Sequence, residues 1–177
     1  MFRVACRMIE INEFDPIFAV CLPETLRILE SNALKVHPAV SQITLHGSRG
    51  LARNPRPESD LDLSLLVSFS APPAIDEGLG KYLREVLEVT SHNWSGPVEL
   101  DLAAVFPLRD CNLVCFQKAT YDPAMCPTGG VDCFGLYKLQ RGFSGFVLNT
   151  GIQVRRMYPC ITIWKMTPPA GSLPQMR

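Results

Sequence analysis

The sequence predicts an α/β fold in which helices alternate with short strands. Leu22, Leu26 and Leu29 recur at the spacing of one helix face. From Leu61 onward, apolar and polar residues alternate, which is typical of a half-buried strand. With 177 residues, the chain is long enough for one domain with a sizeable core.

The N-terminal third contains one predicted helix and one predicted strand. Residues 1–20 fit either a short strand or a helix, and the pattern does not decide between them. The helix covers 23–35, with a proline suited to its first turn, and Pro38 ends it. Val40 to Leu45 is apolar and β-branched, which predicts a buried strand.

The central segment begins with a glycine that ends this strand. Ser48 then opens a predicted short helix through Arg53, and 54–58 form a rigid proline-containing loop. Three further elements complete the predicted core: a strand over 61–69, a helix starting at Pro72-Pro73, and a strand over 98–106 after a loop at 91–97.

The C-terminal part has weaker patterns. Residues 113–121 fit a helix or a strand, and 122–130 are rich in Pro and Gly, which indicates a loop. A short helix is expected around 131–140, and strands are expected within 145–164. We expect a single domain over 1–166, with its core at about 23–106, a C-terminal elaboration at 107–166 and a flexible tail at 167–177.

Charge and cysteine content narrow the class of protein. The formal net charge is zero, which excludes a global basic field for non-specific nucleic-acid binding. No secretory signal and no apolar run of membrane-spanning length is visible, so we expect a cytoplasmic protein with reduced thiols. Cys111, Cys115, Cys126 and Cys133 lack the C-x-x-C pairs of common zinc sites, which favours buried thiols over a zinc site.

Three carboxylates predict a divalent-metal site. Asp60 and Asp62 are two residues apart, so a strand projects both to one side, where they repel each other unless a cation lies between them. Asp101, on a separate predicted strand, is the best third ligand, and Glu99 is the fallback, although a solvated position suits Glu99 better. Such carboxylates suit Mg²⁺, and two ions can assist an in-line displacement at phosphorus. A plain acidic pair at a strand edge is the alternative.

A Gly-Ser turn precedes the acidic pair. Gly47 would let a phosphate approach the backbone, and Ser48 would add a hydroxyl at a helix N-terminus, although a plain helix cap is the alternative. Arg49, Arg53 and Arg56 follow, and they could neutralise a triphosphate or form a solvated basic face.

For two further side chains near these motifs, we predict structural roles. For His46, at the end of the strand, we favour a structural hydrogen bond over a substrate contact. Trp94 precedes the strand of the third acid, and we favour a packing role over stacking on a base.

The combined motif resembles that of a known superfamily. Leu45-His46-Gly47-Ser48-Arg49-Gly50, followed by Ser59-Asp60-Leu61-Asp62-Leu63, is similar to the signature of DNA polymerase β-like nucleotidyltransferases, above all of their minimal members. The resemblance covers about Pro23 to Phe106. It departs from the pattern at His46, where an aromatic residue is usual, and in a slightly longer Ser48–Asp60 loop. From Asp110 on, the chain matches no known pattern.

The resemblance implies a fold, a set of cofactors and a set of site residues. The fold would be a mixed sheet flanked by helices, as in the polymerase β-like palm, and the ligands would be two Mg²⁺ ions, or Mn²⁺, with ATP as the expected nucleoside triphosphate. Asp60, Asp62 and Asp101 would be catalytic and metal-binding, with Asp101 also orienting the attacking hydroxyl. The nucleotide-binding residues would be Gly47, Ser48, Arg49, Arg53 and Ser59.

The implied activity is transfer of a nucleoside monophosphate, AMP in the first place, to a hydroxyl, with release of pyrophosphate. The short C-terminal part looks too small for an acceptor-binding domain, which favours a partner toxin protein as acceptor and an antitoxin-like role. An aminoglycoside-type small molecule is the alternative acceptor, and a non-catalytic nucleotide- or partner-binding protein is the alternative class. Membrane association is not expected, and a nucleic-acid partner is less favoured.

Overall fold

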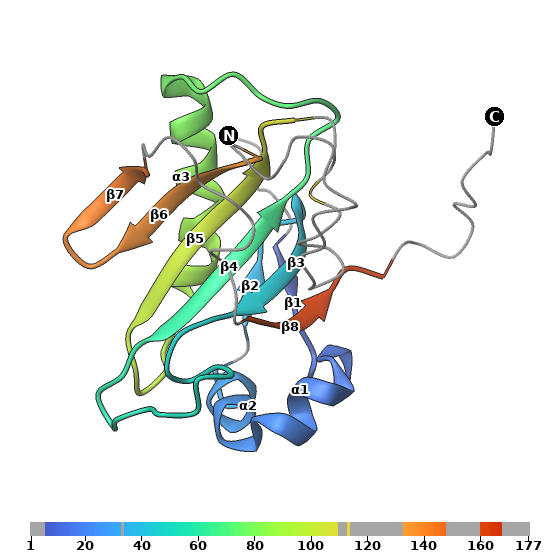
Figure 1. Ribbon diagram of the computed structural model, residues 1–177, viewed down its shortest axis with the longest axis vertical. Helices are drawn as coiled ribbons and strands as arrows, with labels where there is room; N and C mark the ends of the chain where they lie inside the picture. Colours follow the sequence, from blue (N-terminus) through green and yellow to red (C-terminus); the bar gives the residue numbers. More distant parts are fainter. Residues whose placement is uncertain (1–5, 33, 110–112, 114–132, 148–159, 168–177) are drawn as a thin grey trace.

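A computed structural model describes residues 6–32, 34–109, 113, 133–147 and 160–167. Its centre is a six-stranded mixed sheet, with strand order β7-β6-β5-β4-β3-β8, and β1 and β2 form a separate two-stranded sheet. The long helix α3 lies along one side of the large sheet, while α1 and α2 lie together at one end (Figure 1). The predicted mixed α/β architecture is therefore confirmed.

The elements follow one another along the described chain in this order: β1 (Arg7–Met8), the 3₁₀ helix η1 (Ile11–Glu13), α1 (Pro16–Cys21), α2 (Pro23–Glu30), β2 (Lys35–Val36), β3 (Val40–Leu45), β4 (Leu61–Val67), α3 (Glu77–His92), β5 (Leu100–Pro107), β6 (Phe134–Gln140), β7 (Phe143–Phe146) and β8 (Ile161–Lys165). No helix among the described residues is long and apolar enough to span a membrane.

The sheet contains one parallel pair, formed by β4 and β5, and its other pairs are antiparallel. Parallel neighbours need a crossover connection, and α3 supplies it between these two strands. In this register Asp62 lies directly beside Asp101, and Ser64 lies beside Ala103. The crossover thus sets the distance between two of the three predicted metal ligands.

The two sides of the sheet carry different side chains. Next to α3, the space beside Gly80 is filled by the side chains of Tyr137 and Phe146, so Tyr137 points toward the helix. Because side chains alternate along a strand, Lys138 points to the opposite side, together with its paired residue Ala103 and with Asp101. We call the helix-covered side the α3 face, and the side that carries Asp62 and Asp101 the acidic face.

The α3 face holds much of the hydrophobic core. Its helix begins at the cap residue Asp76, whose carboxylate accepts a hydrogen bond from the backbone of Leu79 at 2.8 Å. The buried side of the helix then presents Leu79, Leu83, Val86 and Leu87. These side chains share one buried cluster with leucines of β4 and β5.

Several sequence-based expectations are confirmed with shifted ends. The strand at Val40–Leu45 is present as predicted, and the strand predicted over 61–69 ends at Val67. The first predicted helix ends at Glu30, because Lys35 and Val36 pair with β1 instead of continuing it. Of the strands expected within 145–164, the structure shows the last two residues of β7 and most of β8, and 148–159 lie outside the described residues.

Two predicted helices are wrong. Residues 48–53 form consecutive turns, in which Gly50 N donates to Gly47 O and Arg53 N donates to Gly50 O, each at 3.1 Å. Arg53 adopts a positive φ of 51° just before Asn54-Pro55, and both features end regular helical geometry. The helix expected around 131–140 is instead strand β6, because its backbone pairs with β5 and β7.

The helix expected from Pro72 starts later, at Glu77, because Asp76 supplies the cap, and it continues to His92 into the loop expected at 91–97. The expectations for 114–121, for 122–130 and for the tail after Thr167 lie outside the described residues. Of the four cysteines considered for zinc, Cys133 is buried, as expected, and the other three lie outside the described residues.

Candidate metal centre

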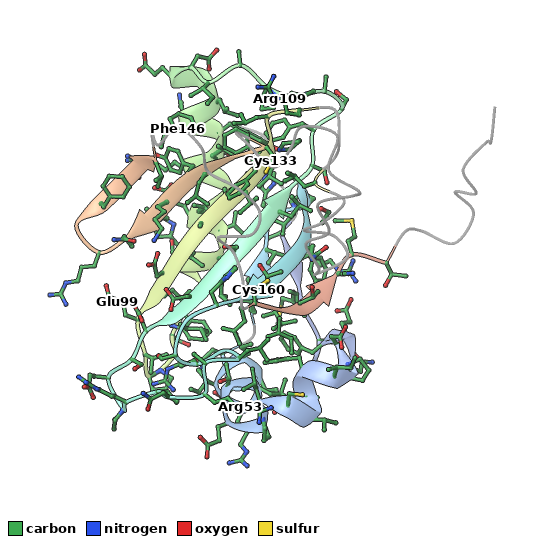
Figure 2. All side chains as sticks on the ribbon, viewed as in Figure 1. Arg53, Glu99, Arg109, Cys133, Phe146 and Cys160 are labelled. Atoms are coloured by element: carbon green, nitrogen blue, oxygen red, sulfur yellow. The ribbon has the colours of Figure 1, made fainter. Side chains whose placement is uncertain are left out.

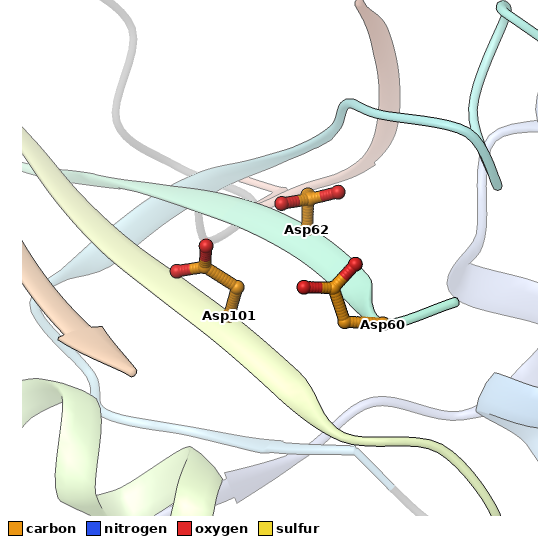
Figure 3. Close-up of side chains that lie close together, drawn as sticks. All are labelled: Asp60, Asp62 and Asp101. Atoms are coloured by element: carbon orange, nitrogen blue, oxygen red, sulfur yellow. The ribbon is translucent and has the colours of Figure 1, made fainter. Parts of the chain in front are cut away.

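Three aspartates meet at the acidic face. Each of Asp60, Asp62 and Asp101 offers a carboxylate oxygen, and these oxygens all lie within 4.8 Å of one another. Figure 3 shows the three side chains converging from β4, from the residue before it and from the adjacent strand β5. The parallel register of the two strands produces this proximity. The structure thus brings together all three acids that the sequence singled out.

The predicted fallback ligand lies elsewhere. Glu99 is exposed, and its carboxylate is 3.9 Å from the guanidinium of Arg141 at the β6–β7 turn. It is labelled in Figure 2, at the margin of the sheet. The preference for a solvated Glu99 is therefore confirmed.

The Gly47 turn lies directly against the acids. A Cβ atom added at Gly47 would lie 1.9 Å from Oδ2 of Asp62, and the residue has a φ of 67°. The backbone N–H of His46 also donates to the carbonyl oxygen of Asp62 at 3.0 Å. Position 47 therefore needs glycine for two independent reasons, the left-handed backbone and the absence of space. The turn and the candidate metal ligand Asp62 are therefore in direct contact.

The electrostatics of the cluster favour a bound cation. Burial, together with the charges of Asp60 and Asp101, raises the pKa of Asp62 to about 6, while Lys138 acts in the opposite direction. Close carboxylates resist joint ionisation unless a positive charge offsets them. Hard carboxylate oxygens are also the ligands that Mg²⁺ and Mn²⁺ prefer. The residues present therefore fit a hard divalent cation.

Lys138 is a member of this site that sequence reasoning missed. Its Nζ lies 3.3 Å from Oδ2 of Asp101 and 3.1 Å from Oε1 of Gln140. It lines a cleft of about 160 Å³ that is also lined by His46, Asp62, Leu63, Ser64, Asp101, Ala103 and Leu136. Alternation from Tyr137 to Gln140, followed by a tight turn at Arg141-Gly142, was the signal that could have indicated the strand.

Apart from Gly47, the predicted nucleotide-binding residues fall into two groups, and the first builds the loop. Arg49 is buried, and its guanidinium donates to the backbone carbonyls of Ser59, Pro57 and Arg56 at 2.7, 3.0 and 3.2 Å. The hydroxyl of Ser59 accepts a hydrogen bond from the backbone N–H of Arg56 at 2.9 Å. These contacts fold the segment between the Gly-Ser turn and the acidic pair.

The second group faces a neighbouring cleft. Ser48 and Arg53 line a space of about 250 Å³ together with the start of α2, including Thr25. The hydroxyl of Thr25 donates to the carbonyl oxygen of Arg49 at 2.8 Å, which ties the turn to that helix. Arg53 is exposed. Gly47 thus lies against Asp62, whereas Ser48 and Arg53 line a neighbouring cleft.

His46 and Trp94 make the structural contacts expected of them. The Nε2 atom of His46 lies 3.0 Å from the hydroxyl of Thr44, with the ring also lining the acidic cleft. The indole of Trp94 donates to the carbonyl oxygen of Val98 at 2.8 Å and packs against the core.

Comparisons with protein-family models, with curated proteins and with solved structures find no match for this chain. Its chemistry must therefore be inferred from its own motifs and geometry.

Proposed function

We propose that the chain is a metal-dependent nucleotidyltransferase that moves a nucleoside monophosphate, AMP in the first place, from a nucleoside triphosphate to a hydroxyl group. The observation that carries this proposal is the meeting of Asp60, Asp62 and Asp101 within 4.8 Å. Two of these acids belong to an Asp-x-Asp motif, and the Gly47 turn lies against Asp62. The same combination of motifs underlies the resemblance to polymerase β-like nucleotidyltransferases.

Each residue has a defined task in this reaction. Asp60, Asp62 and Asp101 would hold Mg²⁺ or Mn²⁺, which when bound neutralises phosphate charge and activates the attacking hydroxyl. Asp101 would orient that hydroxyl, whose oxygen forms a bond to the α-phosphorus as its proton passes to the Asp101 carboxylate and then to water. The bond from the α-phosphorus to the bridging oxygen breaks, and pyrophosphate leaves. Gly47, Ser48 and Arg53 would bind the triphosphate.

The proposed acceptor is a partner protein, such as a toxin in an antitoxin-like relationship, and an aminoglycoside-type small molecule is the alternative. A protein acceptor brings its own binding surface, so the chain needs to hold only the donor nucleotide beside the acids. The cleft at the acids, which has a volume of about 160 Å³ among the described residues, does not discriminate between the two acceptors.

The test is to incubate the protein with Mg²⁺, a cell lysate and each of the four nucleotides labelled at the α-phosphate. We expect label on a protein, abolished in Asp62→Asn and retained in Glu58→Gln, which removes an exposed carboxylate of the loop. Label on a small molecule would select the alternative acceptor. Nucleotide binding without any transfer would indicate a binding protein, and absence of Mg²⁺-dependent nucleotide binding would refute the proposal.

A further inference from the structure

Lys138 is held in the metal centre from two sides. Its ammonium lies 3.3 Å from Oδ2 of Asp101 and 3.1 Å from the amide oxygen of Gln140. The Lys138 and Asp101 side chains are 33% and 17% exposed, so the pair is partly shielded from water. The pairing of β5 with β6 places Lys138 opposite Ala103, which is two residues after Asp101 and points to the same face of the sheet. The strand pairing thus fixes this cation next to the third acid.

The ammonium offsets part of the negative charge of the cluster. Three carboxylates and one ammonium leave a formal charge of −2, the charge that a single divalent ion balances. Among the described residues that line the acidic cleft, Lys138 is the one lysine or arginine. An ammonium on Asp101 and a divalent cation on the same carboxylate repel each other, so the two compete for this acid.

We propose that Lys138 is a built-in counterion of Asp101, which opposes divalent-metal binding in the nucleotide-free protein and moves to the phosphates of a bound nucleoside triphosphate. This inference rests on the proposed function. The flexible four-carbon stem of lysine allows the ammonium to change partner without moving the strand. When Asp101 binds the metal, the phosphates replace it as the negatively charged partner of the Lys138 ammonium.

A consequence of this exchange is that metal and nucleotide bind with positive coupling. The nucleotide draws the ammonium away from Asp101 and so strengthens metal binding. By thermodynamic reciprocity, the metal strengthens nucleotide binding by the same factor. Lys138 therefore acts as a positioning residue that favours loading of metal and donor together.

The first experiment measures Mn²⁺ affinity without nucleotide, by calorimetry or by the spin-resonance signal of free Mn²⁺. Lys138→Met and Lys138→Gln should bind Mn²⁺ on the order of tenfold more tightly than the wild type, because the competing charge is gone. Lys138→Arg keeps the charge and should resemble the wild type. Lys81→Met removes an equal charge from an exposed position on α3, across the sheet, and should also resemble the wild type.

A merely structural role for Lys138 would weaken Mn²⁺ binding in the neutral variants or leave it unchanged, and either result would overturn the proposal. Thermal unfolding of each variant establishes that it is folded. Two different neutral side chains are used, so that a folding defect in one does not decide the outcome.

The second experiment repeats the titration with α,β-methylene-ATP, whose α–β bridge cannot be cleaved. The analogue should strengthen Mn²⁺ binding in the wild type and do so on the order of tenfold less in Lys138→Met. Equal strengthening in both proteins would overturn the transfer of Lys138 to phosphate. If the wild type binds Mn²⁺ yet transfers no nucleotide, the proposed function fails, whereas the nucleotide-free comparison still decides the counterion role.

Discussion

The two faces of the central sheet are built from the same strands but differ in how they contribute to stability. On the α3 face, Leu83 and Val86 are completely buried, and removing such apolar surface from water stabilises the fold. On the acidic face, Asp62 and Asp101 are partly buried beside each other, and the raised pKa of Asp62 shows that its ionised form is disfavoured. The alternation of a strand thus separates the residues that hold the protein together from those that carry charge.

The comparison also indicates what the acidic face is for. The close placement of Asp60, Asp62 and Asp101 disfavours the ionised form of Asp62, although β4 and β5 are otherwise well packed. A divalent cation bound between the carboxylates would offset this unfavourable contribution. Carboxylates whose pKa values are raised by burial and by neighbouring charges are typical of functional sites.

The largest expected effect is on the chemistry of the acidic face. Asp62→Asn should lower nucleotide transfer on the order of a thousandfold, because one charged metal ligand is lost. The same change should raise the melting temperature of the metal-free protein, because it removes a carboxylate that its neighbours disfavour. Labelled-nucleotide transfer and thermal unfolding measure the two effects, with Glu58→Gln as control. A loss of both activity and stability would contradict the separation of the two faces.

The second effect concerns the α3 face alone. Val86→Ala should lower the free energy of unfolding by about 2 kcal/mol, because it leaves a cavity in the core. Val20→Ala makes the same chemical change at a side chain that is 81% exposed, and should cost less than about 0.5 kcal/mol. Urea unfolding measures both, and the folded Val86→Ala protein should keep its Mn²⁺ affinity. Equal losses of unfolding free energy in the two variants would mean that the buried side of α3 does not contribute to the hydrophobic core.

The third effect falls at the contact between the turn and the acids. Gly47→Ala places a methyl group where Oδ2 of Asp62 now lies and strains a left-handed backbone, so we expect about tenfold weaker Mn²⁺ binding and a loss of about 1–3 kcal/mol in stability. Gly142→Ala is the matched control, because that residue also has a positive φ, 77°, but no atom lies within 4 Å of the added carbon. If both variants weakened Mn²⁺ binding equally, the clash with Asp62 would be irrelevant.

The smallest effect is a pH dependence that should differ with and without metal. The pKa of Asp62 is about 6 in the folded protein against an ordinary 3.8, so the folded state binds more protons between these values. Stability from this group is therefore fully present below about pH 4 and is lost as the pH rises through about 6. Mn²⁺ binds the ionised form, so its stabilising effect should grow over the same interval.

Melting temperatures measured from about pH 4 to about pH 8, with and without Mn²⁺, test this linkage. Asp62→Asn should flatten the metal-free curve, whereas Glu58→Gln should leave it as in the wild type. A Mn²⁺ effect of constant size across the range would exclude Asp62 as the titrating ligand.

Local patterns were enough to predict the strand that carries Asp62 and the strand beside it. Alternation along 61–67 set the direction of Asp62, and the apolar run at Val40–Leu45 indicated the adjacent strand. Both signals lie within a few residues of the positions that they describe. The proximity of Asp101, in contrast, was an expectation from motif order, and the structure supplies its cause in the parallel register of β4 and β5.

The features that sequence reasoning missed depend on contacts between distant segments. Residues 134–140 alternate only over their last four positions, which is a weak strand signal, and the pairing with β5 is what makes the whole segment a strand. Lys138 reaches Asp101 through that pairing, so no local motif could have placed it there. Arg49 shows the same limit, because its basic character suggested a phosphate contact, whereas its guanidinium holds the carbonyls of the folded loop.

The parallel pairing of β4 and β5 has a consequence for how the protein folds. Asp62 and Asp101 stand at the same level of neighbouring strands, yet the whole of α3 separates them along the chain. Contacts between segments so far apart in sequence cost loop-closure entropy and form slowly compared with a hairpin such as β6–β7. The two halves of the candidate metal centre therefore come together only when the crossover has closed. If the site binds Mn²⁺, the moment at which a refolding chain first retains the ion would mark that closure.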